Sequence, residues 1–212
     1  MKTQYIVSIV PDTNSGNPRD SFDHFSTLYT WHPRYRIGGM YDITNGDPNE
    51  FMEYLAFDIL HMKENANNVE IVNAIKENIC MVPIYIYDHS GITIQTTPFS
   101  CPWDSGQVGW IFITKETCKE VDIKFEGVRK ILESQIEELN QYLTGDVWGY
   151  TIYSREVEDN AEELLITEDI SEDLIHLDSC WGYYGYDYCK QEALDTVRHY
   201  IKQNQEIASE AA

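Results

Sequence analysis

Alternating β-branched and aromatic residues flank a short glycine-containing turn near the middle of the chain. Residues 84–87 read Ile-Tyr-Ile-Tyr and residues 92–97 read Ile-Thr-Ile-Gln-Thr-Thr, with Asp-His-Ser-Gly between them. Strand-forming residues around a turn that ends in glycine are typical of a β-hairpin. The apolar run at 108–114 predicts a third strand, and residues 5–10 and 147–153 predict two more.

Apolar residues recur at helical spacing in four other segments. Asp47-Pro48-Asn49-Glu50 is typical of a helix start, because aspartate caps free backbone amides and proline suits the first helical position. Further helices are predicted over residues 69–79, from about Cys118 to Leu143, and from roughly Asp187 to Gln203. Residues 204–212 are expected to fray as a tail.

The order of these elements favours an α+β fold. The strands come in runs instead of alternating strictly with helices, which predicts a mostly antiparallel sheet with long amphipathic helices packed on one face. The 212 residues contain no linker rich in Pro, Gly or Ser, so we expect a single domain over 1–203 with an acidic insertion at about 154–177. Within the insertion, either 164–167 or 174–177 returns as a strand; periodicity does not choose between them.

Charge is the strongest global property of the chain. The 36 acids and 15 Lys and Arg residues give a net charge of −21. Nonspecific binding to nucleic acid or to an anionic membrane is therefore disfavoured, and a basic partner is the natural complement. Residues 145–177 hold ten acids and a single basic residue, Arg155. The alternative interpretation is a solvated face that keeps the protein soluble.

Nine of these ten acids follow residue 154, and they are the predicted partner-binding residues. They are Glu156, Glu158, Asp159, Glu162, Glu163, Glu168, Asp169, Glu172 and Asp173.

Cysteine and histidine spacing gives no sign of a bound metal or cofactor. The five cysteines form no CxxC pair, and the six histidines show no HxH or HExxH spacing. No signal peptide is apparent at residues 1–5, and no apolar run approaches the roughly 18 residues of a membrane span. We therefore expect reduced thiols and a cytoplasmic protein with no cofactor, no metal and no membrane partner.

Two tryptophan-containing motifs are the candidate chemical centre. Residues 98–107 read Pro-Phe-Ser-Cys-Pro-Trp-Asp-Ser-Gly-Gln, and residues 178–185 read Asp-Ser-Cys-Trp-Gly-Tyr-Tyr-Gly. In one interpretation the two tryptophans plug the same end of the sheet. In the other, the motifs form a pocket in which a cysteine acts as nucleophile, His89 as base and an aspartate orients it. The candidate pocket residues are Cys101, Trp103, Asp104, Asp178, Cys180 and Trp181.

The early cations Arg34 and Arg36 allow two interpretations as well. They are the one place near the start of the chain where a guanidinium group is available for a phosphate or carboxylate of a ligand. The alternative is that they lie over aromatic rings or pair with nearby acids.

Five stretches together resemble a family of accessory proteins carried by bacteriophages and mobile elements. They are Asn-Pro-Arg-Asp at 17–20, Trp-His-Pro-Arg-Tyr-Arg-Ile-Gly at 31–38, Pro-Phe-Ser-Cys-Pro-Trp-Asp-Ser-Gly-Gln-Val-Gly at 98–109, Leu-Thr-Gly-Asp-Val-Trp-Gly-Tyr at 143–150 and Asp-Ser-Cys-Trp-Gly at 178–182. The resemblance implies a phage or plasmid origin and expression in a bacterial cytoplasm. It supplies no catalytic residues.

Charge and resemblance together predict a non-enzymatic protein that binds and inhibits a bacterial defence component. The expected type is anti-CRISPR or anti-restriction, with carboxylates imitating nucleic-acid phosphates in a basic channel. The alternative is a small enzyme or ligand-binding module whose pocket joins the two tryptophan motifs.

Overall fold

The computed structural model describes residues 1–21, 23–32, 34–35, 37, 40–41 and 47–210. Arg36, one of the two early cations, therefore lies outside the described residues. Contacts gather in two compact units: unit 1 comprises residues 1–16 and 145–212, and unit 2 comprises residues 17–144. The single domain expected over 1–203 stays a prediction.

Unit 2 is built on a mixed sheet with the strand order β3-β2-β6-β4-β5 among the described residues. The pairs are antiparallel except for β2 with β3. The predicted hairpin is confirmed as β4 and β5, joined through Ser90 and Gly91, both of which have positive φ. The strand bounds are β2 Thr27–Thr30, β3 Met40–Tyr41, β4 Ile79–Asp88, β5 Ile92–Gln95 and β6 Ser105–Thr114.

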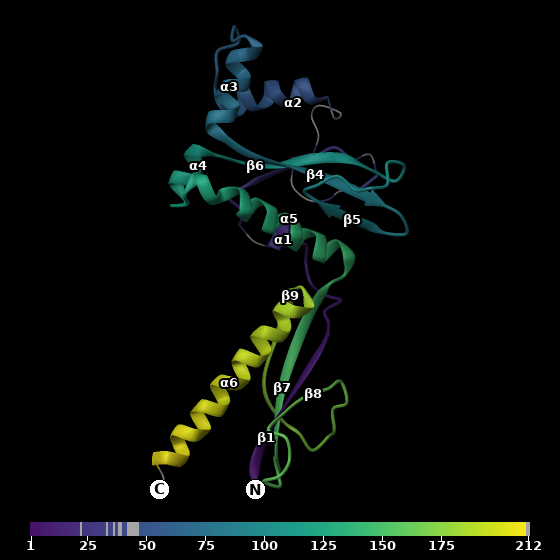
Figure 1. The fold of residues 1–212 in the computed structure, drawn as a ribbon, viewed down its shortest axis with the longest axis vertical. Helices are drawn as coiled ribbons and strands as arrows, with labels where there is room; N and C mark the ends of the chain where they lie inside the picture. The colour runs from purple at the N-terminus through teal and green to yellow at the C-terminus, as the bar shows by residue number, and fades with distance from the viewer. Residues whose placement is uncertain (22, 33, 36, 38–39, 42–46, 211–212) are drawn as a thin grey trace. The chain divides into compact units, whose positions relative to one another are not determined.

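Helices cover both faces of this sheet, whereas the sequence predicted packing on one face. Alternation along the strands explains the difference, because neighbouring residues such as Leu28 and Tyr29 are both buried but point to opposite faces. Leu28 belongs to the core beneath α5, and Tyr29 packs with Phe51 of α2. Figure 1 shows α2 and α3 on one side of β4 and β6, and α5 on the other.

Two helices of unit 2, α2 and α3, start within a residue of the predicted positions. Asp47 caps α2 by accepting a hydrogen bond from the Asn49 amide, as predicted. Asn67 and Glu70 form a capping box at α3. The bounds are α1 Pro18–Ser21, α2 Pro48–Tyr54, the π-helical turn η1 Leu55–Ile59, α3 Asn68–Asn78, α4 Lys115–Glu120, the 3-10 turn η2 Phe125–Gly127 and α5 Val128–Thr144.

The helix predicted from Cys118 to Leu143 is wrong in its first third. The chain leaves α4 through Asp122, which has a φ of 54°. The Ile123 amide bonds to the Cys118 carbonyl and the Asp122 amide bonds to the Lys119 carbonyl, the pairing of a Schellman helix end. Residue spacing did not reveal this end because aspartate, not glycine, takes the left-handed position.

Helix α5 then anchors one face of unit 2. Val128, Leu132, Ile136 and Leu139 are each at most 1% exposed. Burying a side chain of this kind stabilises a fold by about 1.5–3 kcal/mol, so α5 is a major part of the core of this unit.

Unit 1 is a second sheet, with the strand order β8-β1-β7-β9 among the described residues. Here β1 and β9 both run antiparallel to β7, and β8 runs parallel to β1. Both segments that the sequence offered as a returning strand are strands, one in β8 and the other at the start of β9. The bounds are β1 Lys2–Pro11, β7 Val147–Val157, β8 Leu164–Ile166 and β9 Ile175–Tyr184.

One long helix, α6 Tyr186–Glu210, packs on one face of the unit 1 sheet (Figure 1). Cys189, Ala193 and Val197 are buried against strand residues such as Val7 and Ile152. The helix continues past Gln203, where the sequence predicted a frayed tail, and the Asn204 side chain donates to the Tyr5 hydroxyl at 2.6 Å. Among the described residues, no helix has the length and apolar character needed to cross a membrane.

Candidate functional site

The central residues of the acidic segment, which spans residues 154–177, are hydrogen-bonded to the unit 1 sheet. Strand β8 lies within it and pairs with β1. The Tyr5 amide donates to the Glu163 carbonyl at 2.8 Å, and the Thr167 amide donates to the Val7 carbonyl at 3.0 Å. The Gln4 side chain adds a bond to the Glu162 carbonyl at 2.7 Å. The backbone from Glu162 to Thr167 is therefore held against β1, between the two groups of acids.

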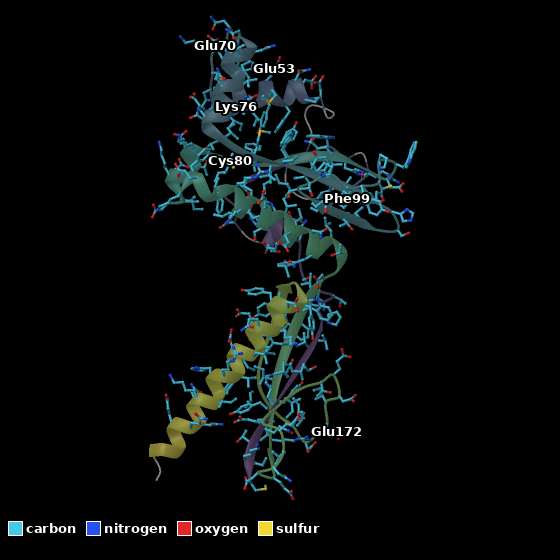
Figure 2. The ribbon with its side chains drawn as sticks, in the orientation of Figure 1. Glu53, Glu70, Lys76, Cys80, Phe99 and Glu172 are labelled. Carbon is cyan, nitrogen blue, oxygen red and sulfur yellow. The ribbon has the colours of Figure 1, made fainter. Side chains whose placement is uncertain are left out.

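All nine predicted acids are solvent-exposed. Glu172, labelled in Figure 2, lies on the connection between β8 and β9. Among the described residues, the one cation within ion-pair distance of the nine is the Met1 amino group, 2.9 Å from Asp159. The Thr3 hydroxyl donates to Glu156 at 3.1 Å. The surface thus carries a high density of negative charge with little compensation from within the chain.

The single arginine of the segment is directed elsewhere. Arg155 Nε donates to the Gln4 side-chain oxygen at 2.9 Å. Its charge still reaches Asp173, whose pKa lies below the ordinary value because the Ser171 hydroxyl donates to it, with smaller contributions from its own backbone amide and from Arg155. Crowded carboxylates repel one another, and a basic surface that approaches them relieves that repulsion. The arrangement suits recognition of a cationic surface.

In unit 2, the Asp104 carboxylate of the first tryptophan motif lies near both the Cys101 thiol of the motif and the imidazole of His89, which follows β4. The Cys101 thiol donates to Asp104 Oδ2 at 3.7 Å, and His89 Nδ1 lies 3.6 Å from the same oxygen. A cysteine nucleophile needs a base or a cation beside its sulfur, because the thiolate is the reactive form. The group hydrogen-bonded to this thiol is the Asp104 carboxylate and not the imidazole, so this geometry does not favour the nucleophile hypothesis.

A cavity of about 280 Å³ opens beside this motif, with Trp103, Asp104, His32 and Arg34 in its lining. Arg34 pairs with Asp88, another lining residue, which matches, for Arg34, the interpretation that it pairs with a nearby acid. Trp103 is 90% exposed. The interpretation that Trp103 plugs the end of a sheet is therefore wrong, because its indole covers almost nothing.

The second tryptophan motif belongs to unit 1, on strand β9. Trp181 lies over Gly149 of β7: a Cβ added to that glycine would stand 2.1 Å from the indole ring. Tyr183 stacks on Tyr150 with ring centroids 5.6 Å apart. Burial raises the pKa of Tyr183, and hydrogen bonds with Cys180 and Tyr150 raise it further.

The six candidate pocket residues are divided equally between the two units. Cys101, Trp103 and Asp104 belong to unit 2, and Asp178, Cys180 and Trp181 belong to unit 1. A single pocket that joins them stays a prediction.

The two cysteines of unit 1 are expected to differ strongly in reactivity. Cys180 is exposed, whereas Cys189 is fully buried and burial raises its pKa to about 11. At about pH 8, iodoacetamide should therefore modify Cys180 and leave Cys189 intact in the native protein, as read by peptide mass spectrometry. Because its folded pKa is raised, Cys189 favours the folded state below its ordinary pKa of 9.0, and this contribution is lost as the pH rises from there through about 11.

Urea-unfolded protein is the control for this prediction, because both thiols should then react. Equal modification of Cys180 and Cys189 in the native protein would contradict the burial described above.

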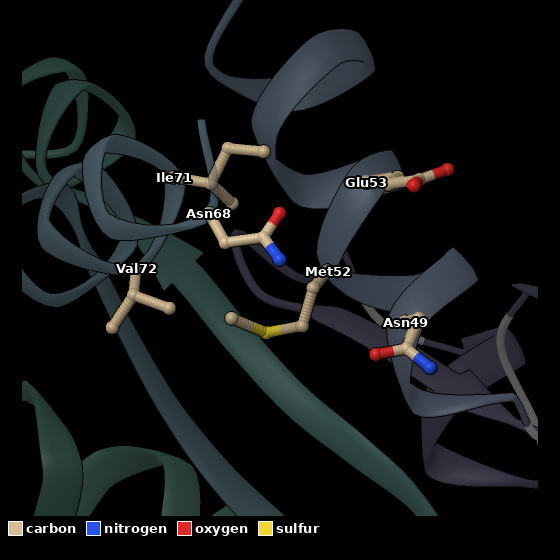
Figure 3. A pocket seen from close by; sticks show the side chains of 6 residues that line it. All are labelled: Asn49, Met52, Glu53, Asn68, Ile71 and Val72. Atoms are coloured by element: carbon tan, nitrogen blue, oxygen red, sulfur yellow. The ribbon is translucent and has the colours of Figure 1, made fainter. Parts of the chain in front are cut away.

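Sequence reasoning missed a further cavity of about 280 Å³ between α2 and α3. In Figure 3 the Met52 side chain reaches toward α3, while Glu53 points away from it. No sequence signal marks this cavity, because it depends on how two helices cross. Its lining residues are Asn49, Met52, Glu53, Asn68, Ile71 and Val72.

Within the part of the chain that the structure describes, no group of three or more His, Cys, Asp or Glu side chains is placed to hold a metal ion. No protein-family model, curated protein or solved structure matches the chain.

Proposed function

We propose that this protein binds a basic protein surface through the nine acids of the acidic segment and thereby inhibits its partner. The observation that carries the proposal is that all nine carboxylates are exposed on a segment whose central residues, 162–167, are hydrogen-bonded to β1. The only arginine of the segment bonds to Gln4 instead of to any of them.

The fastened backbone supports binding for an energetic reason. A mobile acidic tail loses conformational freedom when it binds, and that loss weakens the complex. Strand β8 has already ordered the centre of the segment in the free protein. The dense charge also accelerates encounter with an oppositely charged surface.

The partner that fits best is a nucleic-acid-binding protein. Channels that bind nucleic acid are lined with Lys and Arg, because these side chains neutralise the negative charge of the phosphates. Carboxylates on a folded surface can take the place of those phosphates. Together with the resemblance to phage and mobile-element accessory proteins, this chemistry supports a role as an inhibitor of a bacterial defence component, of anti-restriction or anti-CRISPR type, in the cytoplasm of the host. No enzymatic activity is part of the proposal.

The proposal is tested by capture of partners from bacterial lysate. Tagged protein is compared with a quadruple lysine variant that carries Glu168→Lys, Asp169→Lys, Glu172→Lys and Asp173→Lys. The wild type should retain a basic nucleic-acid-binding protein, release it as salt rises, and inhibit its activity in a purified assay. Retention of the same protein by the variant, or insensitivity to salt, would contradict the proposal.

A second candidate function is binding of a small organic cation in the cavity beside Trp103. The supporting observation is a 90% exposed indole beside the Asp104 carboxylate in that cavity, since an indole face and a carboxylate together suit an ammonium group.

Tetramethylammonium is the probe for this second candidate, followed by tryptophan fluorescence. We expect saturable quenching in the wild type that is lost in Trp103→Ala and weakened in Asp104→Asn. Trp181→Ala, which removes an indole of the other unit, is the matched control and should leave the titration unchanged. A linear response, or one that survives in Trp103→Ala, would exclude this site.

A further inference from the structure

Strand β9 is a long strand at an edge of the unit 1 sheet. It pairs with β7 on one side, and among the described residues no strand pairs with its other side. The opposite edge of the sheet is β8, which is only three residues long. In unit 2 the edge strand β5 is four residues long, and its Ile94 amide is bonded by the Asn140 side chain. Of these edges, β9 offers the longest backbone.

Lysine and proline, two residue types that protect an edge, are missing from β9, although its register with β7 shifts at Trp148/Tyr150 and at Ile152/Tyr153. Natural sheets discourage pairing at their edges with lysine, proline or very short strands. The ten residues of β9 read Ile-His-Leu-Asp-Ser-Cys-Trp-Gly-Tyr-Tyr and include none of these residue types. Ile175 is 64% exposed and Trp181 is 50% exposed. The regular stretch between the two shifts, Asp178 to Cys180, can pair with a further extended segment.

One amide of β9 is bonded by the residue before it. The Ser179 amide donates to Asp178 Oδ1 at 2.8 Å. This local bond satisfies a donor of the strand without a second strand, and the carbonyl of a docking segment can replace it. The Asp178 carboxylate would then be released toward a cation on that segment.

The negative charge around β9 determines which kind of segment can pair with it. Residues 171–189 contain four acids, Glu172, Asp173, Asp178 and Asp187, and neither lysine nor arginine. If a second copy of this chain paired with β9 edge to edge, these acids would lie close to the same acids of the other copy. Like charges destabilise a strand pair when they face each other. A segment rich in Lys and Arg is attracted at the same positions.

We propose that β9 takes up an extended basic segment of the partner as an additional strand of the unit 1 sheet. The inference rests on the proposed function, because it assigns backbone pairing to the same complex in which the acidic segment supplies the charge. Main-chain hydrogen bonds hold such a strand, and the neighbouring acids select a basic one.

The probe is a capped octapeptide of alternating lysine and valine, titrated by calorimetry against the same peptide with every backbone nitrogen methylated. The two peptides carry the same charge, but the methylated one has no backbone donors. We expect binding of the first, protection of β9 amides from hydrogen exchange in its complex, and at least about tenfold weaker binding of the second, which is about 1.4 kcal/mol.

Two variants at one position supply the matched control in the protein. Ser179→Pro removes the amide donor of β9, at an edge where proline is tolerated, and should weaken binding of the unmodified peptide at least about tenfold. Ser179→Ala keeps the amide and should bind as the wild type does.

The outcomes separate the edge from the charge. Equal binding of both peptides, with loss of both in the quadruple lysine variant, overturns pairing at β9 and leaves the proposed function standing. Unchanged binding in the quadruple lysine variant overturns the proposed function itself. No binding of the unmodified peptide at about 1 mM, a concentration at which even a contact of about 4 kcal/mol is seen, overturns the inference.

Discussion

Replacing Glu168, Asp169, Glu172 and Asp173 together by lysine is expected to weaken binding of the basic partner at least about 100-fold, because mutual attraction becomes repulsion. The four acids are exposed, and substitutions at exposed positions usually change the free energy of unfolding by less than about 0.5 kcal/mol each. The loss of binding should therefore occur in a folded protein, as checked by circular dichroism and urea unfolding.

The matched control carries the same change of charge on unit 2. Glu53, Glu64, Glu77 and Glu120 are exposed acids outside the acidic segment, and their replacement by lysine alters the net charge by the same amount. This control should bind nearly as the wild type does, because its four substitutions leave every acid of the acidic segment in place. An equal loss in both variants would show that net charge, and not this surface, determines binding.

Gly109→Ala is expected to be among the most destabilising single substitutions in unit 2, lowering the free energy of unfolding by about 3 kcal/mol. Gly109 pairs with Thr30 of β2. A Cβ at this position would lie 2.3 Å from the Tyr29 carbonyl oxygen and 2.9 Å from a Thr30 methyl. The nearest atom belongs to the backbone and not to a flexible side chain, so β2 must move away from β6 to make room for the Cβ. This movement disturbs the pairing of β2 with β6 that holds the Tyr29 side chain in the core.

Gly106→Ala, in the same strand, is the control for this prediction. A Cβ there would meet no atom within 4 Å, so the substitution should change the free energy of unfolding by less than about 1 kcal/mol, or stabilise slightly by restricting the unfolded chain. Urea unfolding followed by far-ultraviolet circular dichroism measures both. Equal effects of the two substitutions would refute the close approach of β2 and β6.

Local signals predicted much of the secondary structure. The hairpin of β4 and β5 and the start of α2 at Asp47 follow from turn and capping chemistry that involves only a few neighbouring residues. The end of α4 at Asp122 was missed because it depends on hydrogen bonds back into the preceding turn, which spacing does not encode. The coarse class, α+β with mostly antiparallel sheets, was correct.

The sequence predicted which residues make up the candidate site, because they follow from composition. It did not predict how the strands that carry them pair. Charge along the sequence identified the nine acids, and all of them are exposed. The sequence offered residues 164–167 as a candidate strand, but it did not reveal that this strand pairs with β1, because the partner of a strand depends on the whole sheet. The edge position of β9 was missed for a related reason: strand order is a property of the whole sheet.

The pairing of β1 with β7 also sets the order in which the protein can fold during synthesis. Lys2 pairs with Val157, and Pro11 pairs with Trp148. Strand β1 therefore cannot form this pairing until β7, which follows the whole of unit 2 in the sequence, has been synthesised. Unit 2 is continuous in sequence and can fold while the ribosome is still at work, whereas contacts between distant residues form slowly. The acidic segment therefore folds last. Until synthesis is complete, the nascent chain does not present the folded acidic segment to a partner.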